Sequence, residues 1–184
     1  YQEAADNFLK FCSINGNMGE RWQAYLYAAK AFRLGRQFTR AQETALAAIS
    51  ENPSWADPYF EMSAINADLC VGSHEQKIQQ AFAQRAIEWF EEGKKHPQPD
   101  DPRLMKNPLD YDYNPNAVVQ VCYQIVGQLG KAKDLLDEAI AIGPDPRLVE
   151  VRDQYAKVLD RRSAITAGLN LAGHLFGSGE PLKA

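Results

Sequence analysis

Apolar residues recur three and four positions apart through most of the chain, which is the spacing of one face of an α-helix. The rhythm is present from the first residue, in the segment YQEAADNFLKFCSING. No capping residue precedes it, and Gly16 ends it in the way glycine often ends a helix. We therefore expect residues 1–16 to be a helix that is already under way at residue 1, so the chain is expected to be part of a longer protein.

Two later stretches share one pattern of small residues. RAQETALAAISENP (residues 40–53) and KAKDLLDEAIAIGP (residues 131–144) each contain two alanines seven positions apart, followed by a proline. Positions two helical turns apart lie on one face, where a small side chain lets a neighbouring helix come close. We expect four alanines to be buried at such contacts: Ala41, Ala48, Ala132 and Ala139.

Each of these stretches follows another apolar segment and a short turn. LYAAKAFRLG contains Phe32 and ends at Gly35, and VVQVCYQIVG contains Tyr123 and ends at Gly127. The pattern predicts a helix, a tight turn and a second helix, and this unit occurs twice in the chain.

The unit resembles the tetratricopeptide repeat, in which Trp-x2-Leu-Gly-x2-Tyr, then Ala-x3-Phe and Pro, extend over 34 residues. The match is best at residues 22–55 and 113–146, and residues 56–93 form a degenerate copy. Residues 1–16 align with the second helix of the family, with Ala4 and Phe8 in its Ala and Phe places. The alignment has mismatches: Ala45 replaces the expected Phe, and Asn116 and Gln120 occupy the Trp and Gly places.

The resemblance implies an all-α fold, a right-handed α-solenoid of antiparallel helix pairs that forms a single domain over residues 1–184. Residues 147–176 are then expected to be capping helices that cover the last apolar face. The segment KKHPQPDDPRLMKNPLDYDYNP, with its five prolines, interrupts the array, and we assign residues 94–112 to an insert. We expect this insert to pack on the helices through Leu104, Met105, Leu109 and at least one tyrosine, Tyr111 or Tyr113. The alternative is a disordered linker between two separate helical blocks.

Aromatic residues fall into two groups. Five follow the apolar rhythm and are predicted to lie in the core: Phe8, Phe32, Phe82, Phe90 and Tyr123. Trp22 and Trp55 do not follow the rhythm as clearly. Trp55 stands between two prolines, and we expect it to wedge two turns apart.

Composition narrows the classes of function. The net charge is −4 and the pI is near 5.4, which give no general electrostatic reason to expect nucleic acid as a partner. No apolar run approaches the roughly 20 residues of a membrane span. Three widely separated cysteines, Cys12, Cys70 and Cys122, are expected to be reduced and packed in helices, so we expect a cytoplasmic location.

Motifs for catalysis are weak. Asp110-Tyr111-Asp112 has the Asp-x-Asp spacing that some nucleotide-sugar enzymes use for a divalent metal, but no nucleotide-binding α/β pattern accompanies it. The histidines His74, His96 and His174 lack the spacing of a zinc site. We therefore predict no catalytic residue, metal or cofactor in this chain.

Proteins built like this repeat bind an extended peptide or a helix in the concave groove lined by their first helices. Helical spacing assigns eight residues to that face: Gln23, Lys30, Arg33, Asp57, Phe60, Asp68, Asn114 and Gln124. Their charges and amides suit polar contacts with a backbone. The expected partner is a protein or peptide, including a catalytic domain of the same parent chain.

The order of the segments up to about residue 155 also resembles the helical-repeat region found C-terminal to the catalytic domain in bacterial and phage family-2 glycosyltransferases. This resemblance implies that the chain is a non-catalytic interaction module, part of a larger protein such as a glycosyltransferase. The alternative is that the chain forms part of a glycosyltransferase active site, with the insert contributing to the binding of a sugar nucleotide or an acceptor.

Overall fold

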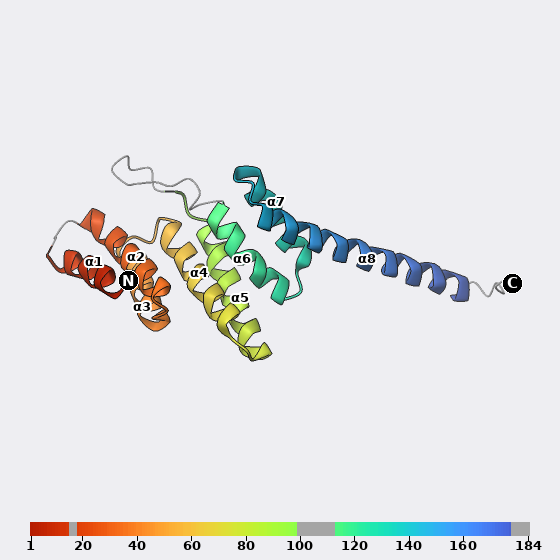
Figure 1. Cartoon of the computed structure of the whole chain (residues 1–184), viewed down its shortest axis with the longest axis horizontal. Helices are drawn as coiled ribbons and strands as arrows, with labels where there is room; N and C mark the ends of the chain where they lie inside the picture. The colour runs from red at the N-terminus through yellow and green to blue at the C-terminus, as the bar shows by residue number, and fades with distance from the viewer. Residues whose placement is uncertain (15–17, 99–112, 178–184) are drawn as a thin grey trace.

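The computed structural model describes residues 1–14, 18–98 and 113–177, and all regular structure in these ranges is helical (Figure 1). The all-α prediction is therefore confirmed for the described residues. The helices are α1 (Gln2–Ile14), α2 (Met18–Leu34), α3 (Phe38–Glu51), α4 (Asp57–Gly72), α5 (Gln76–Gly93), α6 (Tyr113–Ile125), α7 (Leu129–Ile142) and α8 (Pro146–Gly177).

Each helix contacts the next one along the chain. In addition, α2 contacts α4 and α4 contacts α6, so these three helices share one layer. Figure 1 shows α1 to α7 side by side in a row, with α8 starting beside α7 and running on beyond the row. The shared layer brings together the helices that carry all eight predicted site residues.

Two turns have the same backbone hydrogen bonds, one between α2 and α3 and one between α6 and α7. In both turns the last two amides donate to carbonyls three and five residues earlier: Arg36 to Arg33, Gln37 to Phe32, Gly127 to Gln124 and Gln128 to Tyr123. The two helix–turn–helix units that the sequence pattern predicted therefore share a local backbone geometry.

The left-handed residue is a glycine in only one of these two turns. Gly127 has φ +82° in the second turn, but Arg36, not its neighbour Gly35, has φ +58° in the first. A side chain at positive φ brings Cβ close to the following carbonyl oxygen, which glycine avoids. The first turn thus places a strained residue where the second has glycine.

Substitutions at these two turns are expected to change stability in opposite directions. Arg36→Gly should stabilise the chain by about 1 kcal/mol, because it removes the strain of positive φ, and Gly127→Ala should destabilise it by about 1–2 kcal/mol. Urea unfolding measures both. Gly130→Ala is the control, because Gly130 is helical, an added Cβ would meet no atom within 4 Å, and alanine favours the helix. A gain in stability for Gly127→Ala would contradict this interpretation of the turns.

The small residues of α3 and α7 are buried as predicted. Ala41, Ala48, Ala132 and Ala139 are each 0% exposed. In α1 the register differs by one residue from the prediction, because Ala5 is fully buried and Ala4 is exposed. The pattern of two small residues seven positions apart therefore continues in α1 as Ala5 and Cys12.

The degenerate copy has its own close contact, between α4 and α5. An added Cβ at Gly93, the last residue of α5, would lie 2.7 Å from the ring of Phe60 on α4. Phe90, one helical turn before Gly93, and Ala86, two turns before it, are also buried. The hydroxyl of Ser63 donates to the Ala86 carbonyl at 2.8 Å. These contacts hold Phe60 in a fixed position on the α2–α4–α6 layer.

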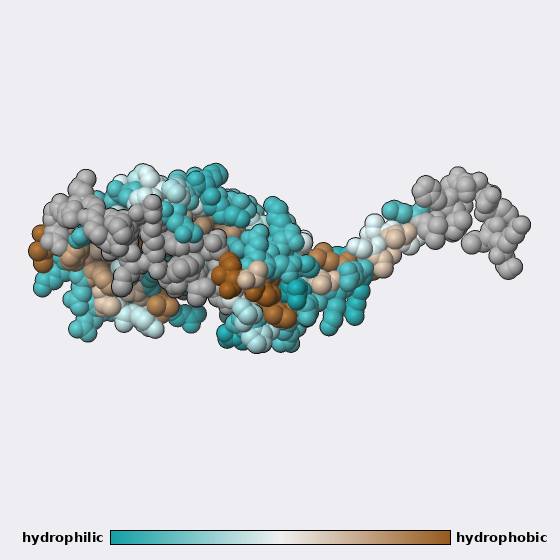
Figure 2. Space-filling view, turned by 90° about the horizontal axis from the view of Figure 1, so that it is seen from above, coloured by the Kyte–Doolittle hydropathy of each residue, from teal (hydrophilic) through white to brown (hydrophobic). Residues whose placement is uncertain are grey.

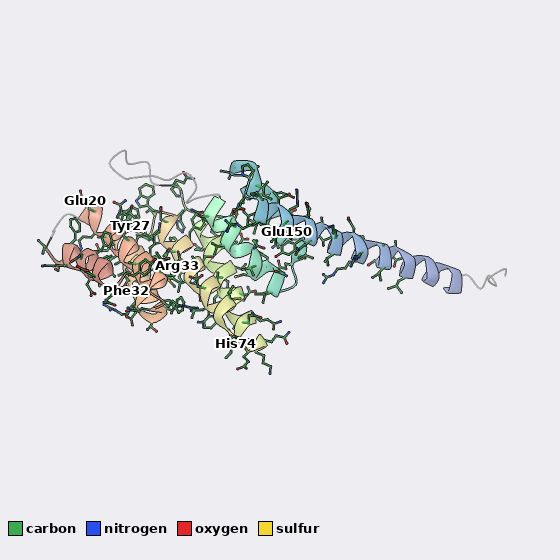
Figure 3. The ribbon with its side chains drawn as sticks, in the orientation of Figure 1. Glu20, Tyr27, Phe32, Arg33, His74 and Glu150 are labelled. Carbon is green, nitrogen blue, oxygen red and sulfur yellow. The ribbon has the colours of Figure 1, made fainter. Side chains whose placement is uncertain are left out.

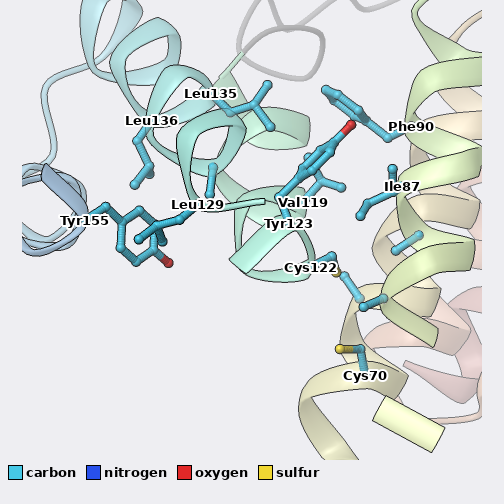
Figure 4. Packing of buried hydrophobic residues seen from close by; sticks show 14 residues of the cluster. Cys70, Ile87, Phe90, Val119, Cys122, Tyr123, Leu129, Leu135, Leu136 and Tyr155 are labelled. Carbon is cyan, nitrogen blue, oxygen red and sulfur yellow. The ribbon is translucent and has the colours of Figure 1, made fainter. Parts of the chain in front are cut away.

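A larger core cluster joins α4, α5, α6, α7 and the first part of α8 (Figure 4). Figure 4 shows Phe90, Val119 and Tyr123 packed together, with Tyr155 of α8 on the other side of Leu129. The hydroxyl of Tyr155 lies 2.8 Å from Oε1 of Gln120. This contact attaches α8 to α6 and gives a polar partner to a residue that departs from the repeat pattern.

The predicted aromatic core is confirmed for three residues, since Phe32, Phe90 and Tyr123 are about 1% exposed, whereas Phe8 and Phe82 are partly buried. The apolar rhythm left the place of Trp22 open, and the structure buries it. Trp22 is 3% exposed and packs with Leu26 and Ala48. Trp55 is partly buried against the same cluster.

Asn116, which also departs from the repeat pattern, is accommodated by a hydrogen bond. Asn116, 4% exposed, donates from Nδ2 to Oε2 of Glu138 at 2.9 Å. A buried amide with a charged acceptor is stable where an unpaired one would not be. The α6–α7 pair therefore closes through a polar contact at the position where the repeat family has Trp.

The described part of the insert is residues 94–98. The ring of His96 stacks on Tyr59 with centroids 4.3 Å apart, and the amide of Ala56 donates to the Pro97 carbonyl at 3.2 Å. The predicted packing residues Leu104, Met105 and Leu109 lie outside the described residues, as do Asp110 and Asp112.

Candidate functional site: a groove between α2, α4 and α6

A groove with a cavity volume of about 360 Å³ lies between α2, α4 and α6. Five of the eight predicted site residues line it: Lys30, Arg33, Asp57, Phe60 and Asn114. They come from three helices that are separated in sequence by intervening helices. Their convergence depends on the contacts of α4 with both α2 and α6.

The other three predicted residues lie elsewhere or at the margin. Asp68 does not line the cavity but accepts a hydrogen bond from Nη1 of Arg33 at 3.0 Å. Gln23 is bonded to the hydroxyl of Tyr27 on its own helix at 3.3 Å. Gln124 does not line the groove either; its Oε1 lies 2.7 Å from the Tyr155 hydroxyl, so it belongs to the contact between α6 and α8.

A partly buried ion cluster adjoins the groove, and two of its residues, Arg33 and Glu61, line it. Nε of Arg33, which Figure 3 labels on α2, lies 2.7 Å from Oε1 of Glu61 on α4. The side chain of Glu61 is only 3% exposed, whereas that of Asp68 is 42% exposed. One guanidinium thus holds two carboxylates, one of them buried and the other open to solvent.

The sequence interpretation missed Glu61, because acidic side chains are rarely buried without a partner. Burial raises the pKa of Glu61, while the positive charges of Arg33 and Lys30 act to lower it. A buried carboxylate depends on such cations, since an uncompensated charge in the interior is costly. Arg33 therefore positions Glu61 and Asp68 and joins α2 to α4.

The rest of the groove is lined by apolar and polar side chains in equal number. Phe60 and Ala64 of α4 face Pro115 and Val118 of α6 across the cavity. Asp57 and Asn114 lie in the first turns of α4 and α6, so both polar residues come from helix N-termini. The groove combines an apolar centre with charged and amide groups around it.

A second hollow lies between α3 and α5, with a cavity volume of about 500 Å³. Leu46 and Trp89 line it, and Met62 and Asn66 contribute from α4. None of the eight predicted site residues belongs to it. It provides a comparison surface for binding experiments on the α2–α4–α6 groove.

The thiols are packing groups. Cys12, Cys70 and Cys122 are free and buried, as predicted. Burial, together with the neighbouring Cys70, raises the pKa of Cys122 to about 12, so this thiol is protonated at neutral pH. Among the described side chains, no three His, Cys, Asp or Glu residues are grouped so that they could hold a metal ion.

Within the described ranges, none of the helices has both the length and the apolar character needed to cross a membrane. No family model matches the chain, and neither the curated proteins nor the solved structures contain a significant match to it.

Proposed function

We propose that the chain is a tetratricopeptide-like interaction module that binds an extended segment of a protein partner in the α2–α4–α6 groove. The observation that carries the proposal is the convergence of five predicted residues on one cavity. Helical spacing and the repeat resemblance together predicted those residues for one face, and they come from three separate helices. The groove offers an apolar centre for a side chain and polar groups for the backbone of a peptide.

Two observations support a solenoid of antiparallel helix pairs as the architecture behind this groove. The first is that α2, α4 and α6 contact one another in order, as the first helices of successive repeats would. The second is the shared hydrogen-bond pattern of the two turns. In this arrangement α8 begins as the capping helix, because Tyr155 is buried against the last pair.

A direct part in glycosyl transfer has less support. It depends on Asp110 and Asp112, which lie outside the described residues. Two carboxylates line the groove itself. Glu61 is buried and paired with Arg33, and Asp57 lies at the start of α4. We therefore favour the interaction module, including a role as a docking surface for a catalytic domain such as that of a glycosyltransferase.

Peptide selection followed by hydrogen exchange tests the proposed function. A randomised dodecapeptide library is selected on the full chain, and the best peptide is then added while exchange is measured. We expect slower exchange in α2, α4 and α6, and no change in α3. Ala64→Phe, which places a ring in the groove, should weaken binding by about tenfold or more.

The matched control is Leu46→Ala, on the α3–α5 hollow, which should leave the affinity unchanged. Circular dichroism and the unfolding midpoint show whether each variant is folded. If Ala64→Phe does not fold, the hydrogen-exchange map of the unmodified chain with the peptide still shows whether the peptide binds in the α2–α4–α6 groove. Protection confined to α3 and α5, or a library with no peptide retained, would refute the proposal.

A further inference from the structure

The outer half of α8, described here over residues 157–170, stands clear of the helix row. The inner half packs on the last helix pair through four residues: Leu148, Val151, Tyr155 and Leu159. From residue 160 to residue 170, by contrast, every residue is exposed. Figure 2 shows this half projecting from the rest of the chain, with hydrophobic and hydrophilic residues both at its surface. No described part of the chain therefore covers it.

Exposed apolar residues continue along one side of this outer half. Val158, Ile165 and Leu169 are 39%, 63% and 68% exposed. They are seven and four positions apart, so they lie on one face of the helix. Arg161 and Arg162 stand three or four positions from the first two of these residues, which places them on the same face. We call these five residues the α8 seam. A narrow apolar line with charges beside it is the pattern by which one helix packs along another.

The arginines of the α8 seam have no acidic partner among the described side chains. Nearer the start of α8, by contrast, Arg152 pairs with Asp137 at 2.9 Å. Asp160, the nearest carboxylate in sequence, precedes Ile165 by five positions and so lies on the other side of the helix. Residues 157–170 carry three cations and one anion, although the net charge of the chain is −4. The α8 seam therefore offers positive charge to a partner.

Two other occupants fit this surface less well. A second copy paired along the same stretch would bring four arginines together, because Arg161 and Arg162 lie at the middle of the seam and like charges repel. A membrane surface needs a broad face with large apolar residues, whereas this seam has three apolar side chains with two arginines between them. A helix whose own apolar line is flanked by Glu or Asp suits both the apolar residues and the charges of the seam.

We infer that the outer half of α8 docks an acidic amphipathic helix of a partner protein. The apolar residues of the partner lie along Val158, Ile165 and Leu169, and its carboxylates pair with Arg161 and Arg162. Opposite charges steer the approach and exclude basic helices, while burial of the apolar line holds the two helices together. This surface is separate from the α2–α4–α6 groove, because none of the residues that line the groove belongs to α8.

Model helices test this inference on the full chain. The probe is a fluorescently labelled three-heptad peptide with Leu at the a and d positions, Glu at the e and g positions and blocked termini, and a second peptide has Lys at e and g. Fluorescence anisotropy measures both affinities. We expect the acidic peptide to bind about tenfold more tightly than the basic one, or better. Hydrogen exchange with the acidic peptide should slow in residues 157–170 and stay unchanged in α2 and α4.

Two double substitutions separate the charge of the seam from its apolar contact. Arg161→Gln/Arg162→Gln should weaken the binding of the acidic peptide about three- to tenfold, because two exposed ion pairs are lost. Ile165→Gln/Leu169→Gln should weaken it about tenfold or more, because the apolar line is interrupted. Glutamine is a good helix former, so α8 itself should persist in both variants. Circular dichroism checks that their helix content is unchanged.

The matched controls make the same kinds of change at exposed residues of other helices: Lys10→Gln/Lys77→Gln for the charge and Val71→Gln/Ile78→Gln for the apolar contact. Both should leave the affinity for the acidic peptide unchanged. If a variant of α8 loses helix content, the hydrogen-exchange map of the unmodified chain with the acidic peptide still shows whether residues 157–170 are the binding surface.

Four outcomes would overturn the inference. The first is equal affinity for the acidic and the basic peptide, and the second is protection in α2 and α4 instead of residues 157–170, which would place the peptide in the groove. The third is a dimer of the unmodified chain in sedimentation that Ile165→Gln/Leu169→Gln dissociates, because a second copy would then occupy the seam. The fourth is binding to phosphatidylserine vesicles without binding of the acidic peptide.

Discussion

Replacing Arg33 by methionine is expected to lower the free energy of unfolding by about 3–5 kcal/mol at pH 7. The reason is the carboxylate of Glu61, which is almost completely buried and lies 2.7 Å from Nε of Arg33. Removing the guanidinium leaves this charge in the interior without its nearest cation. Urea unfolding, with the fraction folded followed by circular dichroism, measures the change.

Two further variants separate the charge from the packing. Arg33→Met/Glu61→Leu replaces the buried pair by apolar groups and should regain most of the lost stability, because no charge remains buried. Asp68→Asn should cost less than about 1 kcal/mol, since that carboxylate is exposed and its contact with Arg33 is a surface contact. A double variant as unstable as Arg33→Met would show that the cost lies in the lost packing of Arg33.

The deficit of Arg33→Met should also depend on pH. Burial already raises the pKa of Glu61, and loss of the opposing Arg33 raises it further. Between the unfolded and the folded pKa the folded state binds the extra proton, so stability increases as the pH falls. The difference between Arg33→Met and the unmodified chain should therefore shrink from pH 7 to pH 5. A deficit that stays constant over this range would contradict a charged Glu61.

Glu61 shows why helical periodicity could not define the whole groove. The pattern correctly brought Asp57 and Phe60 to one face of α4. However, α4 contacts α2, α3, α5 and α6, and residues on nearly all its sides are buried. A helix surrounded in this way has no polar face whose spacing could be recognised. The position of Glu61 depends on its contact with Arg33 on α2. The spacing of residues within α4 carries no information about a contact with another helix.

The register of α1 and the backbone of the first turn likewise depend on contacts that the sequence pattern does not contain. Ala4 and Ala5 are adjacent alanines, so the apolar rhythm fits either register, and only packing on α2 selects Ala5. In the turn after α2, the sequence pattern predicted a short turn beside Gly35, and the structure places positive φ at Arg36, within the turn that the hydrogen bond from Gln37 to Phe32 closes. The sequence pattern located the turn. The backbone hydrogen bonds of the turn determine which of its residues has positive φ.

Replacing Ala48 by leucine is expected to cost about 1–3 kcal/mol, because a fully buried alanine has no room for three more carbons. Ala48 packs with Trp22 and Leu26, so the added atoms would push α3 away from α2. Ala139 has the equivalent place in α7 and is also fully buried, so Ala139→Leu should have a similar cost. Thermal unfolding of each single variant measures the effect.

Ala141→Leu provides the matched control for these substitutions. Ala141 is exposed on the same helix as Ala139, and leucine is almost as favourable as alanine in a helix, so its unfolding midpoint should stay nearly unchanged. Equal costs at positions 48 and 139 would mean that α2–α3 and α6–α7 close on the same small-residue contact. An unchanged midpoint for Ala139→Leu would show that α7 can move away from α6 without loss, and the two helix pairs would then not be equivalent in packing.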